Sequence, residues 1–211
     1  MLQIGRAGRM AVGVLVAAGA GALRAEAPAA SRVRVGDPAP MTTVMMKSVD
    51  GSQVSIAGVA GDKGTLVVFS CNACPWVKAW EDRIAALGNA YREKGVGVIA
   101  INSNDPAAVP EDGYEVMQQR ARDKALKFPY VVDATSEVAL AFGATRTPEA
   151  FLFGKDGRLV YHGTIDDNAH EPDKVKAHYL RDALEALIAG QPIAQKETKA
   201  LGCGIKFRAR A

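Results

Sequence analysis

Two uninterrupted apolar runs constrain the fold of this chain most strongly. Residues 65–70 and 96–103 are rich in β-branched side chains, as expected of strands buried on both faces of a sheet. Between them, residues 75–94 repeat apolar side chains at helical spacing, and Gly95 then supplies a stop signal. This order predicts a β-α-β unit, in which a helix connects two parallel strands.

The other elements extend this unit along the chain. The sequence predicts a hairpin turning at Asp50-Gly51, a helix over 114–127, a short strand at 129–133, a short helix over 136–143 with Ser136 as its N-cap, a hairpin about Lys155-Asp156-Gly157, and a helix over 174–189. The alternation favours a largely parallel sheet with an antiparallel pair added late. We therefore expect an α/β fold whose central mixed sheet is flanked by helices, with an N-terminal β-hairpin and a helical insertion.

Composition narrows the possible functions. The 211 residues are 48% hydrophobic and 23% charged, which suits one globular domain, or at most two, with a core that needs no disulfide staples. The three cysteines are therefore not a structural framework, and we expect them to do chemistry. The formal charge of +3 lies partly at the termini, so we expect no nucleic-acid partner.

The first 25 residues have the layout of a secretory signal peptide. Arg6 and Arg9 precede an uncharged run of small apolar residues that is too short to span a bilayer comfortably. We expect cleavage near residue 25 and a periplasmic or otherwise extracytoplasmic protein, with membrane contact only if the segment is retained. Residues 26–36 then form a tether, 37–192 the folded domain, and 193–211 a C-terminal tail.

Cys71 and Cys74 lie where the first buried strand stops and the long helical pattern begins. A tetrahedral metal site needs four ligands, but the chain has no second C-x-x-C, and its three histidines lie far along the sequence. A static disulfide between residues three apart closes a very small loop and stabilises little. Metal clamp and structural staple remain alternatives, and the redox couple is the favoured interpretation.

The electrostatics of a helix start support that interpretation. Unpaired N–H groups and the helix dipole favour a thiolate at Cys71, and exposure at the turn would let another disulfide reach it. Cys74 lies on the same helical face and is able to close the intramolecular disulfide. Pro75 is tolerated in the first turn, and Trp76 is expected beside the disulfide, partly exposed.

A second feature, Thr147-Pro148, stands just before an apolar strand run. A proline at a strand start is commonly trans, whereas a cis bond would mark a tight functional turn. If this segment faces the cysteines, the backbone of Thr147 would pair with an extended substrate strand beside the sulfurs.

Together these motifs resemble the thioredoxin superfamily. The stretches FSCNACPWVKAWEDR, AINSNDP, EDGYEVM, FPYVVDATSEVALAFGATRTPEAFLF, LVYHGTIDDN and GCGIKF are similar to its redoxin branch, related to the alkyl hydroperoxide reductase and thiol-specific antioxidant group. The resemblance implies Cys71 as attacking sulfur, Cys74 as resolving sulfur and Pro148 as a cis-proline. The pair departs from Trp-Cys-Gly-Pro-Cys of thioredoxins proper, which leaves reduction potential and substrate open.

The expected function is thiol–disulfide exchange with a partner protein, without an organic cofactor or a metal. A thiol peroxidase acting on peroxide is the first alternative, but the residue three before Cys71 is Val68, where peroxiredoxins carry Thr or Ser. Arg146 would be the arginine near such a site, although a surface arginine is the favoured interpretation of this residue. A copper-binding module using His162 is less favoured, because its cysteines would be spaced one residue further apart.

Cys203 stands between two glycines in the tail. The flanking glycines permit a tight backbone excursion, so the tail is able to fold back toward Cys71 and present a third functional thiol. The alternative is an incidental buried or exposed cysteine.

Overall fold

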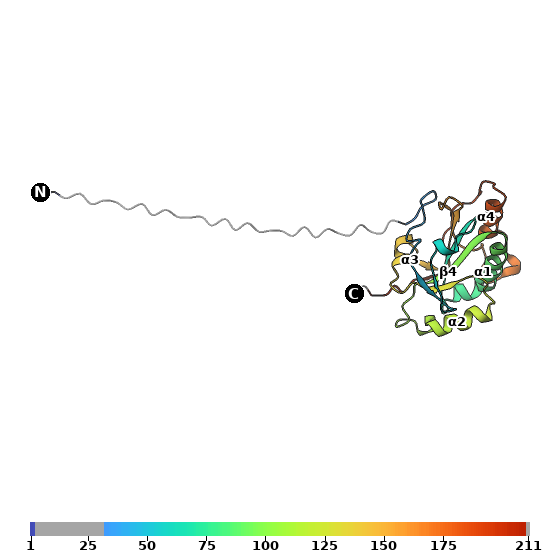
Figure 1. Ribbon diagram of the computed structural model, residues 1–211, viewed down its shortest axis with the longest axis horizontal. Coiled ribbons are helices and arrows are strands. Elements are labelled where there is room, and N and C mark those ends of the chain that lie inside the picture. Colours follow the sequence, from blue (N-terminus) through green and yellow to red (C-terminus); the bar gives the residue numbers. More distant parts are fainter. Residues whose placement is uncertain (3–31, 210–211) are drawn as a thin grey trace.

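The computed structural model describes residues 1–2 and 32–209 (Figure 1). Its helices are α1 (Pro75–Glu93), α2 (Tyr114–Asp123), α3 (Glu137–Phe142) and α4 (Tyr179–Ile188), and its 3-10 turns are Ala57–Val59, Pro110–Asp112 and Pro172–Lys174. Its strands are β1 (Met46–Ser48), β2 (Gln53–Val54), β3 (Gly64–Phe69), β4 (Val96–Asn102), β5 (Tyr130–Val132), β6 (Arg146–Thr147), β7 (Glu149–Gly154), β8 (Leu159–Gly163) and β9 (Cys203–Gly204).

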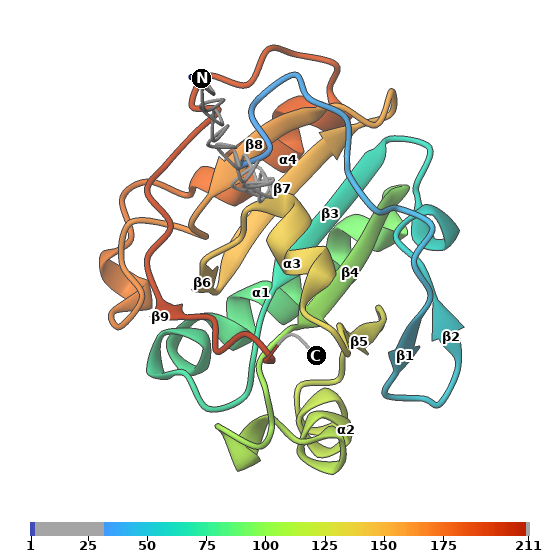
Figure 2. The ribbon, with the colours of Figure 1, turned by 90° about the vertical axis from the view of Figure 1, so that its left-hand side faces the viewer.

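The central sheet is mixed. One group of strands runs in the order β2-β1-β5-β4 and another in the order β3-β7-β8. β3 lies beside β4 (Figure 2), and the N–H of Ser70 donates to the carbonyl of Ile101 at 2.8 Å. β4 and β5 are parallel, whereas β7 runs antiparallel to both β3 and β8, and β1 runs antiparallel to β5. The mixed sheet flanked by helices is confirmed, but the largely parallel sheet is wrong, because the segment after Pro148 returns antiparallel along β3.

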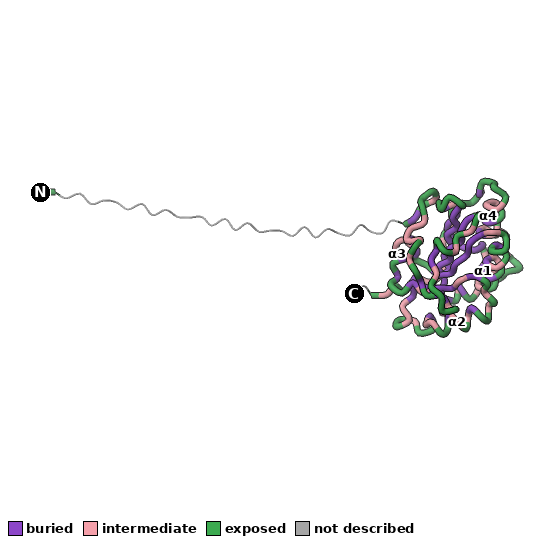
Figure 3. The backbone as a smooth tube through the Cα atoms, in the orientation of Figure 1, coloured by how far each residue is buried: buried purple, intermediate pink, exposed green. Residues whose placement is uncertain are grey.

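Two apolar clusters cover the two faces of the sheet. Figure 1 shows α1 and α4 on one side of β4 and α3 on the other. Leu66 and Val68 of β3 pack with residues of α1 and α4, while Val67 and Phe69 pack with residues of α3. Side chains alternate across a strand, so β3 contributes to both clusters and reads as one continuous apolar run. Figure 3 shows the resulting buried strands at the centre of the domain.

Helix α1 begins and ends as its sequence predicts. Pro75 is its first residue, and Gly95 follows its C-cap with a φ of 89°, a left-handed conformation that glycine adopts at little cost. Trp80, fully buried, anchors the helix to the sheet, and its indole N–H donates to Asp166 at 2.7 Å. The start of this helix, and with it the cysteine pair, is therefore fixed against the sheet.

Two helices differ from their predicted bounds. α2 ends at Asp123 rather than residue 127, because Ala125 adopts a positive φ of 48° and the N–H of Leu126 turns back to the carbonyl of Ala121. α4 begins at Tyr179 rather than residue 174, because Pro172–Lys174 forms a separate 3-10 turn that extended Val175 ends.

The expected N-cap of α3 is also different. Ser136 occupies the N-cap position, but its hydroxyl donates to the carbonyl of Ser103 at 2.8 Å instead of capping the helix. A carboxylate oxygen of Asp133 accepts from the N–H of Ala139 at 3.0 Å and supplies the cap. Propensity correctly predicted a cap at this end, but tertiary contacts decided which side chain provides it.

Both predicted hairpins are present. β1 and β2 pair about the Asp50-Gly51 turn, and β7 and β8 pair about a turn containing Gly157. The expected helical insertion corresponds to the Pro110–Asp112 turn and α2, which connect β4 to β5.

Apart from residues 1–2, the predicted signal peptide lies outside the described residues, as does most of the predicted tether. From Arg32 onward the chain contacts the domain: Val33 is buried, and its N–H donates to the carbonyl of Phe142. In the part of the chain that the structure describes, no helix is long and apolar enough to cross a membrane.

Candidate functional site: the three cysteines

The cysteine pair lies at the junction of β3 and α1. Cys71 follows the end of β3, and Cys74 is the N-cap residue of α1. Pro75, the first helical residue, is exposed, and Trp76 is half-buried. Both thiols are free, and together with Val77 they form a small buried cluster. The predicted strand-to-helix position of the pair is confirmed.

The expected exposure of the pair is wrong. Cys71 and Cys74 are each only 3% exposed. Trp76 and Cys203 pack against the cluster that contains them. A thiol exchanges only when a partner sulfur reaches it. In this arrangement the tail lies against the cysteine pair and restricts that access.

Thr147 faces both sulfurs from the opposite side. Its peptide bond to Pro148 is cis. The hydroxyl of Thr147 lies 3.1 Å from the sulfur of Cys71, and the thiol of Cys74 donates to the carbonyl of Thr147 at 3.2 Å. The two segments singled out in the sequence therefore meet in one place, although 73 to 76 residues separate the partners in these bonds.

A hydrogen bond between the two sulfurs moves their pKa values apart. This bond is the main cause that lowers the pKa of Cys74 to about 4, against the effect of burial and with help from the side chain of Cys203 and the N–H of Val77. The same bond raises the pKa of Cys71 above its ordinary value, as do burial and the negative charge of Asp112, while the Thr147 hydroxyl opposes the rise. These opposite shifts describe one interacting pair that shares a proton, and the expected lowering of the pKa at Cys71 stays a prediction.

A buried carboxylate that sequence reasoning missed holds the turn between the cysteines. Asp112, 3% exposed, accepts hydrogen bonds from the backbone N–H groups of Asn72 and Ala73. Its other oxygen accepts from the side-chain amide of Asn104 at 2.7 Å. The hydroxyl of Tyr130 donates to the side-chain oxygen of Asn72 at 3.0 Å, so the first residue between the cysteines is fixed by backbone and side chain.

A second missed carboxylate holds the segment before Pro148. One oxygen of Glu149 accepts from the N–H groups of Thr145 and Arg146 at 2.8 and 2.9 Å. The other oxygen lies 2.8 Å from Arg32 and 2.7 Å from Nε2 of His162. Burial opposes the charged form of Glu149, but these hydrogen bonds hold its pKa below the ordinary value. Its position immediately after Pro148 was the only sequence signal for this role.

The third cysteine joins the other two. β9 pairs antiparallel with β6, and this register sets Cys203 opposite Thr147 and Gly204 opposite Arg146. Cys203 is half-exposed and packs against the Cys71–Cys74 cluster. Burial and the neighbouring Cys74 raise the pKa of Cys203 to about 11. The expectation that the tail folds back to the pair is confirmed, and the thiol that acts on Cys203 is that of Cys74 rather than Cys71.

The remaining candidates lie outside this cluster. Arg146 is exposed, and its side chain bonds the carbonyl of Gly202 at 3.3 Å. His162 is committed to Glu149. Among the residues that the structure describes, no group of three or more His, Cys, Asp and Glu side chains is arranged to hold a metal ion.

Known proteins share this architecture. A model of the Redoxin family matches residues 34–178. The thiol-disulfide oxidoreductase ResA of Halalkalibacterium halodurans is 28% identical over 131 residues, which cover 62% of this chain and 68% of that protein. The crystal structure of an uncharacterized conserved protein from Geobacillus kaustophilus is 38% identical, with a TM-score of 0.77 over 84% of this chain and 94% of that chain.

A more distant neighbour identifies the fold. The solution structure of a thioredoxin-like protein in the oxidized form is 17% identical, with a TM-score of 0.57 over 75% of this chain and 97% of that chain. At this identity the likeness concerns the fold alone. The family match and this likeness give the chain a thioredoxin-like fold. More narrowly, because the family model spans more than half of its length, the chain belongs to the Redoxin family, as the sequence motifs predicted.

Proposed function

We propose that this protein is an exported thiol–disulfide oxidoreductase that exchanges disulfides with a partner protein through Cys71 and Cys74. The observation that carries the proposal is the contact of both sulfurs with Thr147, the residue before the cis-proline. Export rests on the signal-like pattern of residues 1–25, which lie almost entirely outside the described part of the chain.

Attack by Cys71 needs the proton of the reduced pair on Cys74. Thr147 suits this state, because its hydroxyl is a donor for a Cys71 thiolate and its carbonyl is an acceptor for a Cys74 thiol. We therefore assign Thr147 the role of stabilising the attacking form of the pair.

The exchange itself then balances. The Cys71 thiolate attacks one sulfur of the partner disulfide, forming a mixed disulfide and releasing the other sulfur as a thiolate that takes up a proton. Cys74 loses its proton and attacks the Cys71 sulfur, which releases the partner as a dithiol. The protein is left with a Cys71–Cys74 disulfide, two electrons having passed to the partner. Run backwards, the same steps oxidise a partner dithiol.

Insulin reduction tests this proposal. Cys71→Ser is expected to remove most of the catalysed reduction, and Cys74→Ser is expected to accumulate a mixed disulfide with the substrate at Cys71, because its resolving sulfur is gone. Turnover by Cys71→Ser at the rate of the unaltered protein would refute the mechanism. Thr147→Val, which keeps the carbonyl and removes the hydroxyl, is expected to slow the reaction without abolishing it.

One observation supports thiol peroxidase activity as a second candidate. A cavity of about 40 Å³ lies beside Cys71, and its lining includes Arg120 and Tyr130. This space suits a molecule little larger than water, such as hydrogen peroxide. Peroxide consumption with sulfenic acid at Cys71 in the Cys74→Ser variant would support this function, and an unmodified Cys71 after peroxide treatment would exclude it.

A further inference from the structure

The C-terminal tail occupies the edge of Thr147 that an incoming substrate strand would use. β9 pairs with β6 in antiparallel register, with Cys203 opposite Thr147. Figure 2 shows β9 beside β6, with the rest of the tail continuing past the end of the sheet. An extended partner strand would make the same kind of backbone pairing next to a cis-proline. The chain thus presents one of its own cysteines in the position expected for a substrate cysteine.

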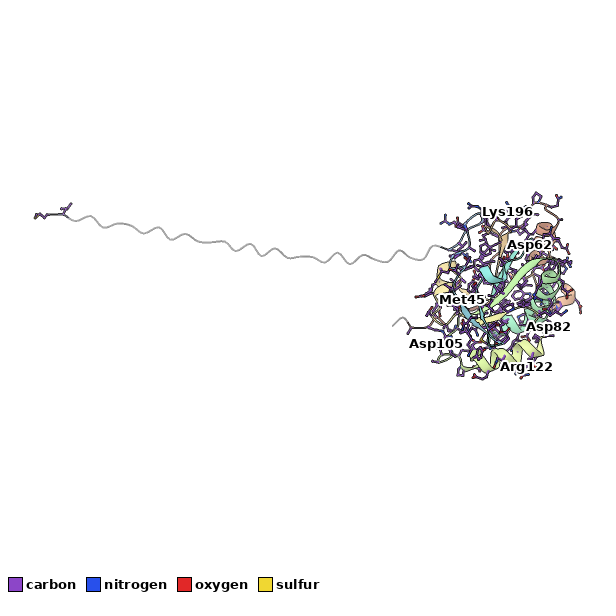
Figure 4. The ribbon with its side chains drawn as sticks, viewed as in Figure 1. Met45, Asp62, Asp82, Asp105, Arg122 and Lys196 are labelled. Carbon is purple, nitrogen blue, oxygen red and sulfur yellow. The ribbon has the colours of Figure 1, made fainter. Side chains whose placement is uncertain are left out.

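Contacts on both sides of Cys203 hold the tail in place. Upstream, the N–H of Thr198 donates to the carbonyl of His162 at 2.9 Å. Downstream, the N–H of Ile205 donates to the carbonyl of Thr145 at 3.0 Å, and the carbonyl of Lys206 accepts from the N–H of Asp105 at 2.7 Å. Figure 4 labels Asp105 at the edge of the domain. Cys203 is therefore held at the pair from both directions.

Gly202 makes this close approach possible. A Cβ atom at Gly202 would lie 2.1 Å from the carbonyl oxygen of Thr147. The backbone fixes the positions of both atoms, so no side-chain movement would relieve this clash. A Cβ atom at Gly204 would meet no clash. Its nearest neighbours would be the side-chain nitrogen of Lys206 and the carbonyl oxygen of Thr145, each 4.0 Å away. Of the two glycines that flank Cys203, only the first is required by the contact with Thr147.

We propose that Cys203 is a third redox thiol of this site, which forms a disulfide with Cys74 and so relays between the buried pair and an outside partner. The inference rests on the proposed thiol–disulfide exchange. It follows from the exposure of the three residues: Cys71 and Cys74 are 3% exposed, whereas Cys203 is partly exposed and packs against them. An outside thiol or disulfide meets Cys203 before it meets the other two.

The relay step is an internal exchange with no net oxidation. The Cys203 sulfur gives up its proton and attacks the Cys74 sulfur of the Cys71–Cys74 disulfide. The new bond joins Cys74 to Cys203, and Cys71 leaves as a thiolate that takes up the proton. The two electrons of the couple are conserved, and the disulfide moves from a buried position to one that includes the partly exposed Cys203.

Disulfide mapping in a Cys71→Ser background tests the proposal independently of turnover. With oxidised glutathione as oxidant, we expect a Cys74–Cys203 bond within a single chain, with two glutathione molecules released for each bond. Adding Gly202→Ala is expected to lower the rate of this bond's formation about tenfold or more, because the tail loses its close alignment. The matched change Gly204→Ala is expected to leave the rate unchanged.

Two results would overturn the relay: a Cys71→Ser protein that carries glutathione on Cys74 without an internal bond, or equal rates of bond formation in the two glycine variants. Circular dichroism of each variant verifies that the domain remains folded. Insulin turnover is measured in parallel on proteins that retain Cys71. If the internal bond forms but insulin is not reduced, the proposed exchange function is refuted, while Cys203 still belongs to the cluster. If insulin is reduced but the internal bond never forms, only the relay is refuted.

Discussion

Asp112 and Glu149 are two buried carboxylates with parallel tasks and different surroundings. Each accepts hydrogen bonds from two consecutive backbone N–H groups beside the sulfurs, Asp112 in the turn between the cysteines and Glu149 in the segment before Pro148. Glu149 also lies against Arg32 and His162. In the described part of the chain, Asp112 takes part in no ion pair, and its side-chain partner is the neutral amide of Asn104.

This difference separates a structural charge from one that acts on the thiols. Arg32 and the hydrogen bond with His162 compensate the charge of Glu149, so we expect Glu149 to act mainly on the stability of the fold. The charge of Asp112 reaches Cys71 and raises the pKa of that thiol. Both carboxylates therefore hold backbone N–H groups, but only the charge of Asp112 acts on a thiol. Removing the charge should have different effects at the two positions.

Neutralising Glu149 is expected to give the largest loss of stability. Glu149→Gln leaves buried polar groups without their charged partner, and the free energy of unfolding should fall by about 3 kcal/mol. Urea denaturation at neutral pH measures this loss. Glu111→Gln removes an exposed acid next to Asp112 and should change the free energy of unfolding by less than about 0.5 kcal/mol. Equal effects of the two changes would show that Glu149 is not a stabilising ion-pair member.

The pH dependence of stability gives a second measure of Glu149. Its pKa is lowered in the folded protein, so the unfolded chain binds its proton first as the pH falls. Its contribution is complete above the unfolded pKa of about 4.3 and is lost as the pH falls through the lower folded value. The difference in unfolding free energy between the unaltered protein and Glu149→Gln should therefore be constant near neutral pH and shrink in acid. A difference that grows on acidification would reverse the assigned sign.

Neutralising Asp112 should act on the thiol. In a Cys74→Ser, Cys203→Ser background, Asp112→Asn is expected to lower the pKa of Cys71, because a nearby negative charge that disfavours the thiolate is removed. A pH titration of thiolate ultraviolet absorbance reports Cys71 alone in this background and does not require access to the buried sulfur. Glu111→Gln in the same background is the matched control. An unchanged or raised pKa in Asp112→Asn would show that its charge does not govern Cys71.

Sequence reasoning found the parts of this site that local pattern encodes. The junction of β3 and α1 follows from a buried strand run, a proline in the first turn and a glycine stop, all readable within 31 residues from 65 to 95. The Thr147-Pro148 segment was found for the same reason. Both segments contain proline or glycine residues, which restrict or permit particular backbone conformations locally and can therefore be recognised in the sequence.

The missed parts depend on tertiary contacts. Asp112 bonds the N–H of Asn72 from 40 residues away, and nothing in the pattern around either residue distinguishes this acid from a solvated one. The burial of the pair was missed because the tail that covers it begins more than 100 residues later.

The smallest expected effect concerns Arg32, the arginine partner of Glu149. Arg32 has a side chain that is 49% exposed, whereas that of His162 is 3% exposed, so the two partners of the same carboxylate oxygen differ in solvent screening. Arg32→Gln should lower the free energy of unfolding by only about 0.5 kcal/mol, as for other solvent-exposed pairs, and added salt should reduce the loss. Arg34→Gln, at an exposed position in no ion pair of the described residues, is the control. A loss with Arg32→Gln as large as that with Glu149→Gln would mean that the arginine, and not the buried histidine, compensates the carboxylate that holds the segment before Pro148.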